Sequence, residues 1–80
     1  MPRFFFHVKN GVRLVTDQTG KELDDLNAAR QEGTMLAREI RAEITKPAAL
    51  VNELRVEIED EVGTILDTIM LAQVAPLDSD

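Results

Sequence analysis

The chain has 80 residues, enough for one domain and too few for two. It carries 15 acidic and 9 basic residues, for a net charge of −6, and the basic residues stand singly along the sequence. Because nucleic-acid backbones are bound by clustered cations, this balance argues against a nucleic-acid partner. The absence of cysteine excludes a disulfide scaffold and a thiolate metal site.

The N-terminus MPRFFFHV has neither the long apolar region nor the small-residue cleavage site of a signal peptide. No apolar run approaches the roughly 20 residues that a membrane-spanning helix needs. We therefore expect a cytoplasmic protein that makes no contact with a membrane.

The N-terminal segment predicts a β-hairpin. Residues 3–9 alternate, with Phe4, Phe6 and Val8 on one face and Phe5, His7 and Lys9 on the other. Asn10-Gly11 supplies the positive φ angles of a type I′ turn, which predicts a return strand over residues 12–16. A second turn follows at residues 17–20, where Asp17 is expected to bond its own backbone and Gly20 to take the left-handed conformation.

Residues 25–45 have the only sustained helical periodicity in the chain. Asp24 or Asp25 can cap the start, and Pro47 disfavours helical geometry beyond residue 45. Gly33 lies on the apolar face and indicates a close approach of another backbone or of an aromatic ring, which would come from the N-terminal strand. The apolar positions, spaced by three and four, are Leu26, Ala29, Gly33, Leu36, Ala37, Ile40 and Ile44.

Two further strands are predicted after the helix. Residues 53–59 alternate cleanly between apolar and charged side chains, so one face of this strand is wet. Residues 64–71 are ambiguous, because Asp67 shares a face with apolar neighbours. Either Asp67 lies at the edge of the sheet, or a bulge exchanges the faces, or both faces are covered. Residues 73–80 lack periodicity and predict a flexible acidic tail, leaving 1–72 as the single domain.

The order β-β-α-β-β predicts an α+β domain in two layers, with one helix on one face of a four-stranded antiparallel sheet. If the first and third strands are central neighbours, every pairing is antiparallel and the spatial order is 2-1-3-4.

Several motifs resemble a family of small bacterial proteins of unknown function that begin M-P-R, two aromatics and F. The shared features are MPRFFFHV, the NG turn, the pattern DxxGxELxDLxAAR over residues 17–30, and VEIEDEVGTIL. The resemblance runs from Met1 to about Leu71. It implies a small cytoplasmic domain and carries over no catalytic residue.

No residue pattern predicts catalysis, a cofactor or a metal. His7 is the only histidine, and we expect a half-exposed strand residue rather than a metal ligand or base. The carboxylates of residues 57–61 are expected to face solvent. Ser79 is the only serine and lies in the expected tail, so a serine nucleophile is excluded.

The aromatic strand is the most informative feature for function. If the helix covers Phe4 and Phe6, then Phe5 lies on the open face, and an exposed apolar patch on a small domain suggests a partner surface. We expect a non-enzymatic protein-interaction module that homodimerises through the open sheet face or an edge strand. The alternative is a regulatory nucleic-acid-binding domain, which would stack bases on the sheet. The candidate interaction residues are Arg3, Phe5, His7, Val15, Leu66 and Met70.

Overall fold

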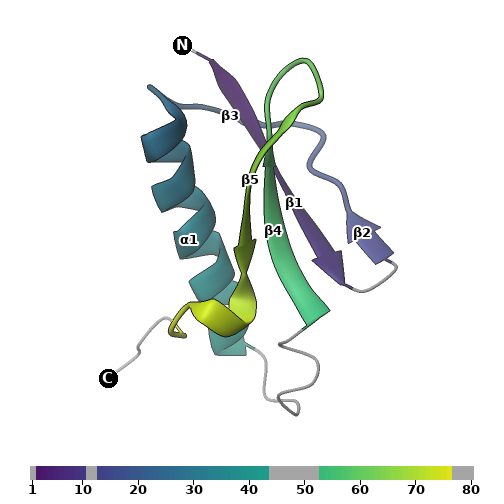
Figure 1. Ribbon diagram of the computed structural model, residues 1–80, viewed down its shortest axis with the longest axis vertical. Coiled ribbons are helices and arrows are strands. Elements are labelled where there is room, and N and C mark those ends of the chain that lie inside the picture. Colours follow the sequence, from purple (N-terminus) through teal and green to yellow (C-terminus); the bar gives the residue numbers. More distant parts are fainter. Residues whose placement is uncertain (1, 11–12, 44–52, 77–80) are drawn as a thin grey trace.

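The computed structural model describes residues 2–10, 13–43 and 53–76. In these residues one helix packs on one face of an antiparallel sheet, which confirms the α+β architecture (Figure 1). The elements are β1 (Arg3–Asn10), β2 (Arg13–Val15), β3 (Lys21–Glu22), α1 (Leu26–Glu43), β4 (Leu54–Glu59), β5 (Ile65–Met70) and the 3₁₀ turn η1 (Leu71–Gln73).

The sheet has the order β2-β1-β4-β5, so the predicted spatial order is confirmed, with β1 and β4 as the central pair. Every pairing is antiparallel, and Phe6 lies opposite Ile58. The strand β3 was not predicted; its two residues pair with the start of β1. It lies on the same edge as β2, because β2 pairs with the other end of β1.

The first hairpin differs in detail from the prediction. Asn10 is the last residue of β1, pairs with Arg13 and does not have a positive φ. Residues 11–12 lie outside the described part of the chain, and Asn10 is a strand residue rather than a central turn residue with a positive φ. The expected left-handed Gly20 is confirmed, with a φ of 75°.

The core lies between α1 and the helix-facing side of the sheet. Alternation in β1 and β4 places apolar side chains there, and the expectation that Phe4 and Phe6 face the helix is confirmed. The buried apolar residues among those described are Phe4, Phe6, Ala29, Ala37, Leu54, Val56, Ile58 and Leu71.

The small residues of α1 allow the helix to approach the sheet closely. Ala29, Gly33 and Ala37 are buried on its inner face, while Asp25 caps its start by accepting the Ala28 N–H at 2.9 Å. A β-carbon on Gly33 would lie 2.9 Å from Ile69 Cδ1. The neighbours of Gly33 are thus the aliphatic side chains of Ile69 and Ile58, so the expectation of an aromatic ring or another backbone there was wrong.

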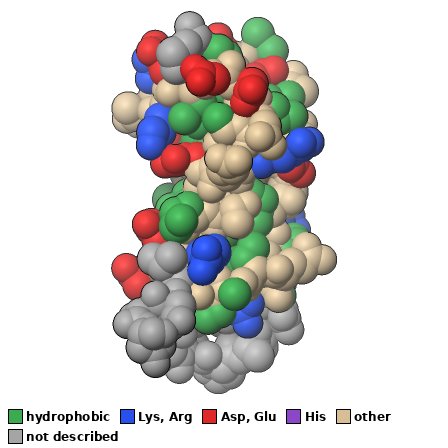
Figure 2. All heavy atoms as spheres, turned by 90° about the vertical axis from the view of Figure 1, so that its left-hand side faces the viewer, with side chains coloured by type: hydrophobic (Ala, Val, Ile, Leu, Met, Phe, Trp, Pro, Cys, Tyr) green, Lys and Arg blue, Asp and Glu red, His purple; other side chains and the backbone are tan. Residues whose placement is uncertain are grey.

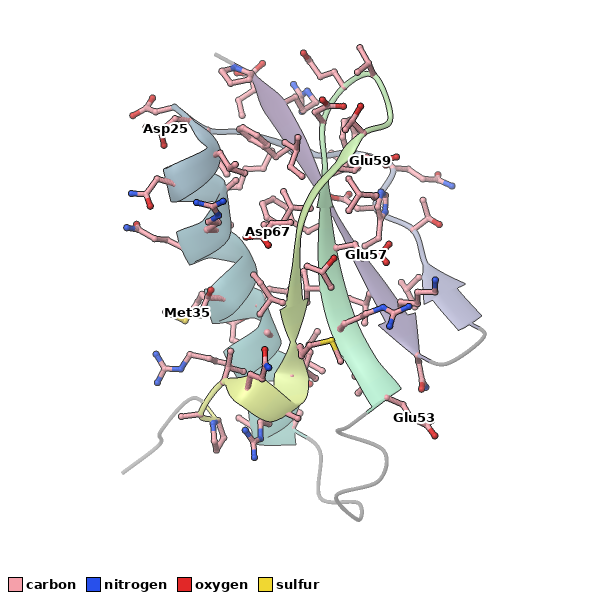
Figure 3. All side chains as sticks on the ribbon, viewed as in Figure 1. Asp25, Met35, Glu53, Glu57, Glu59 and Asp67 are labelled. Atoms are coloured by element: carbon pink, nitrogen blue, oxygen red, sulfur yellow. The ribbon has the colours of Figure 1, made fainter. Side chains whose placement is uncertain are left out.

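Two of the alternatives that the sequence left open for Asp67, the edge position and the bulge, are both found in the structure. It lies on the edge strand β5, and a β-bulge interrupts the pairing, with Asp67 opposite Ile58 but Ile65 opposite Glu59. Figure 3 shows Asp67 between β5 and α1. Arg30 of α1 reaches the Asp67 carboxylate at 2.8 Å, so this charge on the helix side is paired.

The chain after β5 is fastened to the helix. Leu71 is fully buried, and Val74 packs against the core. Arg41 donates to the carbonyls of Leu71 and Val74, and Arg38 donates to the Ala75 carbonyl at 3.2 Å. Residues 74 and 75 of the predicted tail thus contact the helix, and residues 77–80 lie outside the described part.

Candidate functional site

The open face of the sheet, opposite α1, has the buried His7 at its centre. The His7 side chain points away from the helix but is only 6% exposed, so the expectation of a half-exposed residue was wrong. The edge segment explains the burial. Between the pairs Phe4–Lys21 and Val8–Val15, β1 has three residues and the edge segment has five, residues 16–20. The two extra residues loop out and bring the backbone of Asp17 against the imidazole.

Two hydrogen bonds fix the tautomer of His7. The backbone N–H of Asp17 donates to Nδ1 at 3.0 Å, so Nδ1 has no proton. The proton is therefore on Nε2, which lies 2.5 Å from Glu59 Oε1 and donates to it. In this state the imidazole is neutral, and His7 joins the edge loop to the central strand β4.

Asp17 closes the gap that the loop leaves in the sheet. Its carboxylate accepts the backbone N–H groups of Phe6, Thr19 and Gly20 at 3.0–3.2 Å, which confirms the predicted turn and also replaces a missing strand partner of β1. Burial raises the pKa of Asp17, but these three hydrogen bonds outweigh it and hold the pKa below its ordinary value of 3.8.

Three rows of paired residues make up the rest of the open face. The row of Phe5 continues through Glu59 to Ile65, the row of His7 through Glu57 to Thr68, and the row of Lys9 through Arg55 to Met70. Figure 3 shows Glu57 and Glu59 pointing away from α1. Within these three rows the carboxylates Glu57 and Glu59 lie toward one end and the cations Lys9 and Arg55 toward the other, and Arg3 lies beyond the row of Phe5. In the same molecule Arg55 lies 3.6 Å from Glu57.

Four of the six candidate interaction residues lie on this open face: Arg3, Phe5, His7 and Met70. Val15 pairs with Val8 and therefore lies on the helix side, at 59% exposure. Leu66 packs against the core, because the bulge turns it toward the helix. The candidate residues did not include Ile65, which pairs with Glu59 on the open face and is 46% exposed. The β-bulge in β5 places Ile65 on this face, and the sequence pattern does not show the bulge.

Comparison with protein families identifies the chain. The model of a domain of unknown function, DUF6894, matches residues 3–72, which include every strand and the helix described above. The chain belongs to the DUF6894 family. No curated protein and no solved structure matches the chain.

The geometry of the DUF6894 domain limits what His7 can do. Both ring nitrogens are engaged in hydrogen bonds within the chain, so neither offers a free lone pair to a metal or a substrate. In residues 2–10, 13–43 and 53–76, no three histidine, cysteine or carboxylate side chains gather in a way that could hold a metal ion. His7 is thus a structural link between the edge loop and β4.

Within the described residues, no helix combines the length and apolar character that a bilayer crossing requires.

Both edges of the DUF6894 sheet carry features that oppose pairing with another strand. At one edge, β2 has three residues and β3 has two. At the other, the Asp67 carboxylate accepts the backbone N–H of Thr68 on its own strand at 2.8 Å, which occupies a donor that an incoming strand would need. Among the described residues the open face of the sheet is covered by the edge loop at His7 only, and no helix packs on it.

Proposed function

We propose that this domain is a non-enzymatic interaction module that pairs with a second copy of itself through the open sheet face. The observation that carries the proposal is the order of charges along the paired residues of β1 and β4, with Glu57 and Glu59 toward one end and Lys9 and Arg55 toward the other. Along these two strands the pattern is complementary to that of a second copy turned end for end.

A two-fold axis that lies in the interface, across the strands and between Arg55 and Glu57, produces this arrangement. Each β4 then lies over the β4 of its partner in the opposite direction. Arg55 of one copy faces Glu57 of the other, twice per dimer, while Met70 faces Thr68. Ile65, which is 46% exposed, and the half-buried Phe5 add apolar surface beside Glu59.

The size of the face predicts the strength of the contact. Four strands at about 4.8 Å spacing and six residues at about 3.3 Å give a face of about 20 by 20 Å. Burying it on both copies hides on the order of 800 Å², about half of a standard interface. The proposal therefore describes a weak, transient dimer, since interfaces of this size belong to the transient class. A nucleic-acid partner is disfavoured on the same face, because carboxylates on its central strand repel phosphate.

Charge reversal tests the proposal directly. Arg55→Glu places two carboxylates opposite each other across the interface, and Glu57→Lys places two cations there, so each variant alone should be monomeric by sedimentation equilibrium. The double variant with Arg55→Glu and Glu57→Lys restores opposite charges and should dimerise like the parent chain.

Mixing the two single variants gives the matched control for specificity. An equimolar mixture should form heterodimers, although neither variant dimerises alone, because the carboxylate introduced at position 55 of one chain then faces the ammonium group introduced at position 57 of the other. Circular dichroism should show all variants folded, since both side chains are on the open face and neither belongs to the hydrophobic core. A dimer that survives either single reversal, or a mixture that stays monomeric, would contradict the proposed face.

A further inference from the structure

A second candidate site lies on the helix side of the molecule, away from the open face. A hollow of about 330 Å³ opens between α1 and the edge formed by β1 and β3. This volume is at the lower end of the range for small-molecule pockets. Its lining residues are Phe6, Asp17, Lys21, Glu32, Met35, Leu36 and Glu39. The hollow exists because the edge beside β1 consists of two short strands joined by a loop, so the helix overhangs it.

The floor of the hollow is apolar and its rim is acidic. Phe6, Met35 and Leu36 supply the apolar surface, and Met35 is 42% exposed although it is a large hydrophobic residue. Figure 2, which views the helix side, shows hydrophobic side chains exposed among charged ones. A methionine is an adaptable contact for a ligand, and its sulfur interacts favourably with aromatic rings.

The charges of α1 are divided between its two flanks. The flank toward β5 carries Arg30, Arg38 and Arg41, and each of them is bound to Asp67 or to backbone carbonyls after β5. The flank toward the hollow carries Glu32 and Glu39. Of the cations described, only Lys21 lines the hollow, and it is paired with Glu32 at 2.7 Å.

Two carboxylates at the hollow remain without a compensating cation. Glu39 forms no ion pair with any described residue. Asp17 accepts only neutral backbone N–H groups, which hold its charge in place without cancelling it. The hollow therefore has a negative potential beside an apolar floor.

We propose that this hollow binds a small organic cation, an ammonium or guanidinium group on a short apolar body. The apolar body lies on Phe6, Met35 and Leu36, and the cationic group lies toward Glu39 and Asp17. A free small molecule fits better than a basic protein surface, because Asp17 and Glu39 line one hollow of small volume. This inference is independent of the proposed dimer, which uses the opposite face of the sheet.

The test is a titration of the full chain, labelled with ¹⁵N, with 2-phenylethylammonium as the probe. Saturable amide shifts at the residues around the hollow are expected. Phenylacetate has the same ring and the opposite charge, and 2-phenylethanol has no charge; both should bind more weakly. Equal shifts with phenylacetate, or no saturation with the ammonium probe, would overturn the proposal.

Two variants of the same helix give a matched comparison. Glu39→Gln removes an exposed rim charge and should weaken binding by up to about fivefold, the range for a partly solvated ion pair. Glu43→Gln removes an exposed charge of α1 outside the hollow and should leave the affinity unchanged. Met35→Ser should also weaken binding through loss of apolar contact. Equal affinities of Glu39→Gln and Glu43→Gln would place the cation elsewhere.

Discussion

Replacing Asp17 by asparagine tests how the edge loop is held. The asparagine side chain has almost the same shape, but only one of its two polar atoms accepts hydrogen bonds. In the parent chain one carboxylate oxygen accepts Phe6 N–H and the other accepts Thr19 and Gly20 N–H. The asparagine must therefore turn its NH₂ group toward at least one backbone donor.

An unsatisfied, partly buried N–H costs about 1–3 kcal/mol. We expect Asp17→Asn to lower the free energy of unfolding by about 2 kcal/mol, which corresponds to a fall in Tm of about 8–16 °C for a domain of this size. Thermal and urea unfolding followed by far-UV circular dichroism measure this change. Glu61→Gln, in the exposed turn between β4 and β5, is the control and should leave stability unchanged within about 0.5 kcal/mol.

The pH dependence gives the sharper check. Because the pKa of Asp17 is lower in the folded chain than its ordinary value of 3.8, its contribution is complete above that value and is lost as pH falls through the folded pKa. The stability gap between the parent and Asp17→Asn should be constant from neutral pH to about pH 5 and should narrow below about pH 4. A gap below about 0.5 kcal/mol at neutral pH, or one that does not narrow in acid, would refute this account of the loop.

Further substitutions at three positions probe the packing and the protected edge. Gly33→Ala should be nearly neutral in urea unfolding, because a helix-propensity gain of about 1 kcal/mol offsets the displacement of the Ile69 methyl group. Gly33→Val should lower the free energy of unfolding by about 1–3 kcal/mol, and equal effects of the two variants would contradict the close contact. Leu71→Ala should cost about 2–5 kcal/mol in the same assay, and a loss below about 1 kcal/mol would mean that η1 does not anchor the core. Asp67→Val frees the Thr68 N–H, so thioflavin fluorescence should show faster aggregation than in the parent; unchanged aggregation would show that Asp67 does not protect the edge.

The layers of this fold follow from local sequence patterns. Alternation in residues 3–9 and 53–59 assigns Phe4, Phe6, Val56 and Ile58 to one side, and the only helical period in the chain supplies the cover for that side. These patterns depend on neighbouring residues, so they can be interpreted from one sequence. The order of the strands then follows from antiparallel pairing of two hairpins.

The errors arise where the pairing register departs from simple alternation. Val15 was assigned to the open face, but a shift of one residue in the pairing moves a side chain to the other face, and the Val8–Val15 pair sets the register. Leu66 was assigned to the open face, but a bulge opposite Glu59 places Ile65 there and turns Leu66 toward the core. Side-chain periodicity does not predict such a bulge.

His7 shows the same limit for the candidate site. Its burial depends on Asp17, ten residues away, and on Glu59, 52 residues away. In the sequence, Asp17 is interpreted as a turn residue and Glu59 as a solvent-facing carboxylate. Their convergence requires the extra residues of the edge loop and the β1–β4 register, which only the three-dimensional structure provides.

The central claim is that the helix covers one face of the sheet and leaves the other for a second copy. Sedimentation equilibrium of the parent chain up to about 1 mM, beside Phe5→Ser on the open face and Val15→Ser on the helix side, tests it most directly. We predict reversible dimers for the parent and Val15→Ser, and a folded monomer for Phe5→Ser. A parent chain that stays monomeric over this range, or a Phe5→Ser variant that dimerises as well as the parent, would contradict the account.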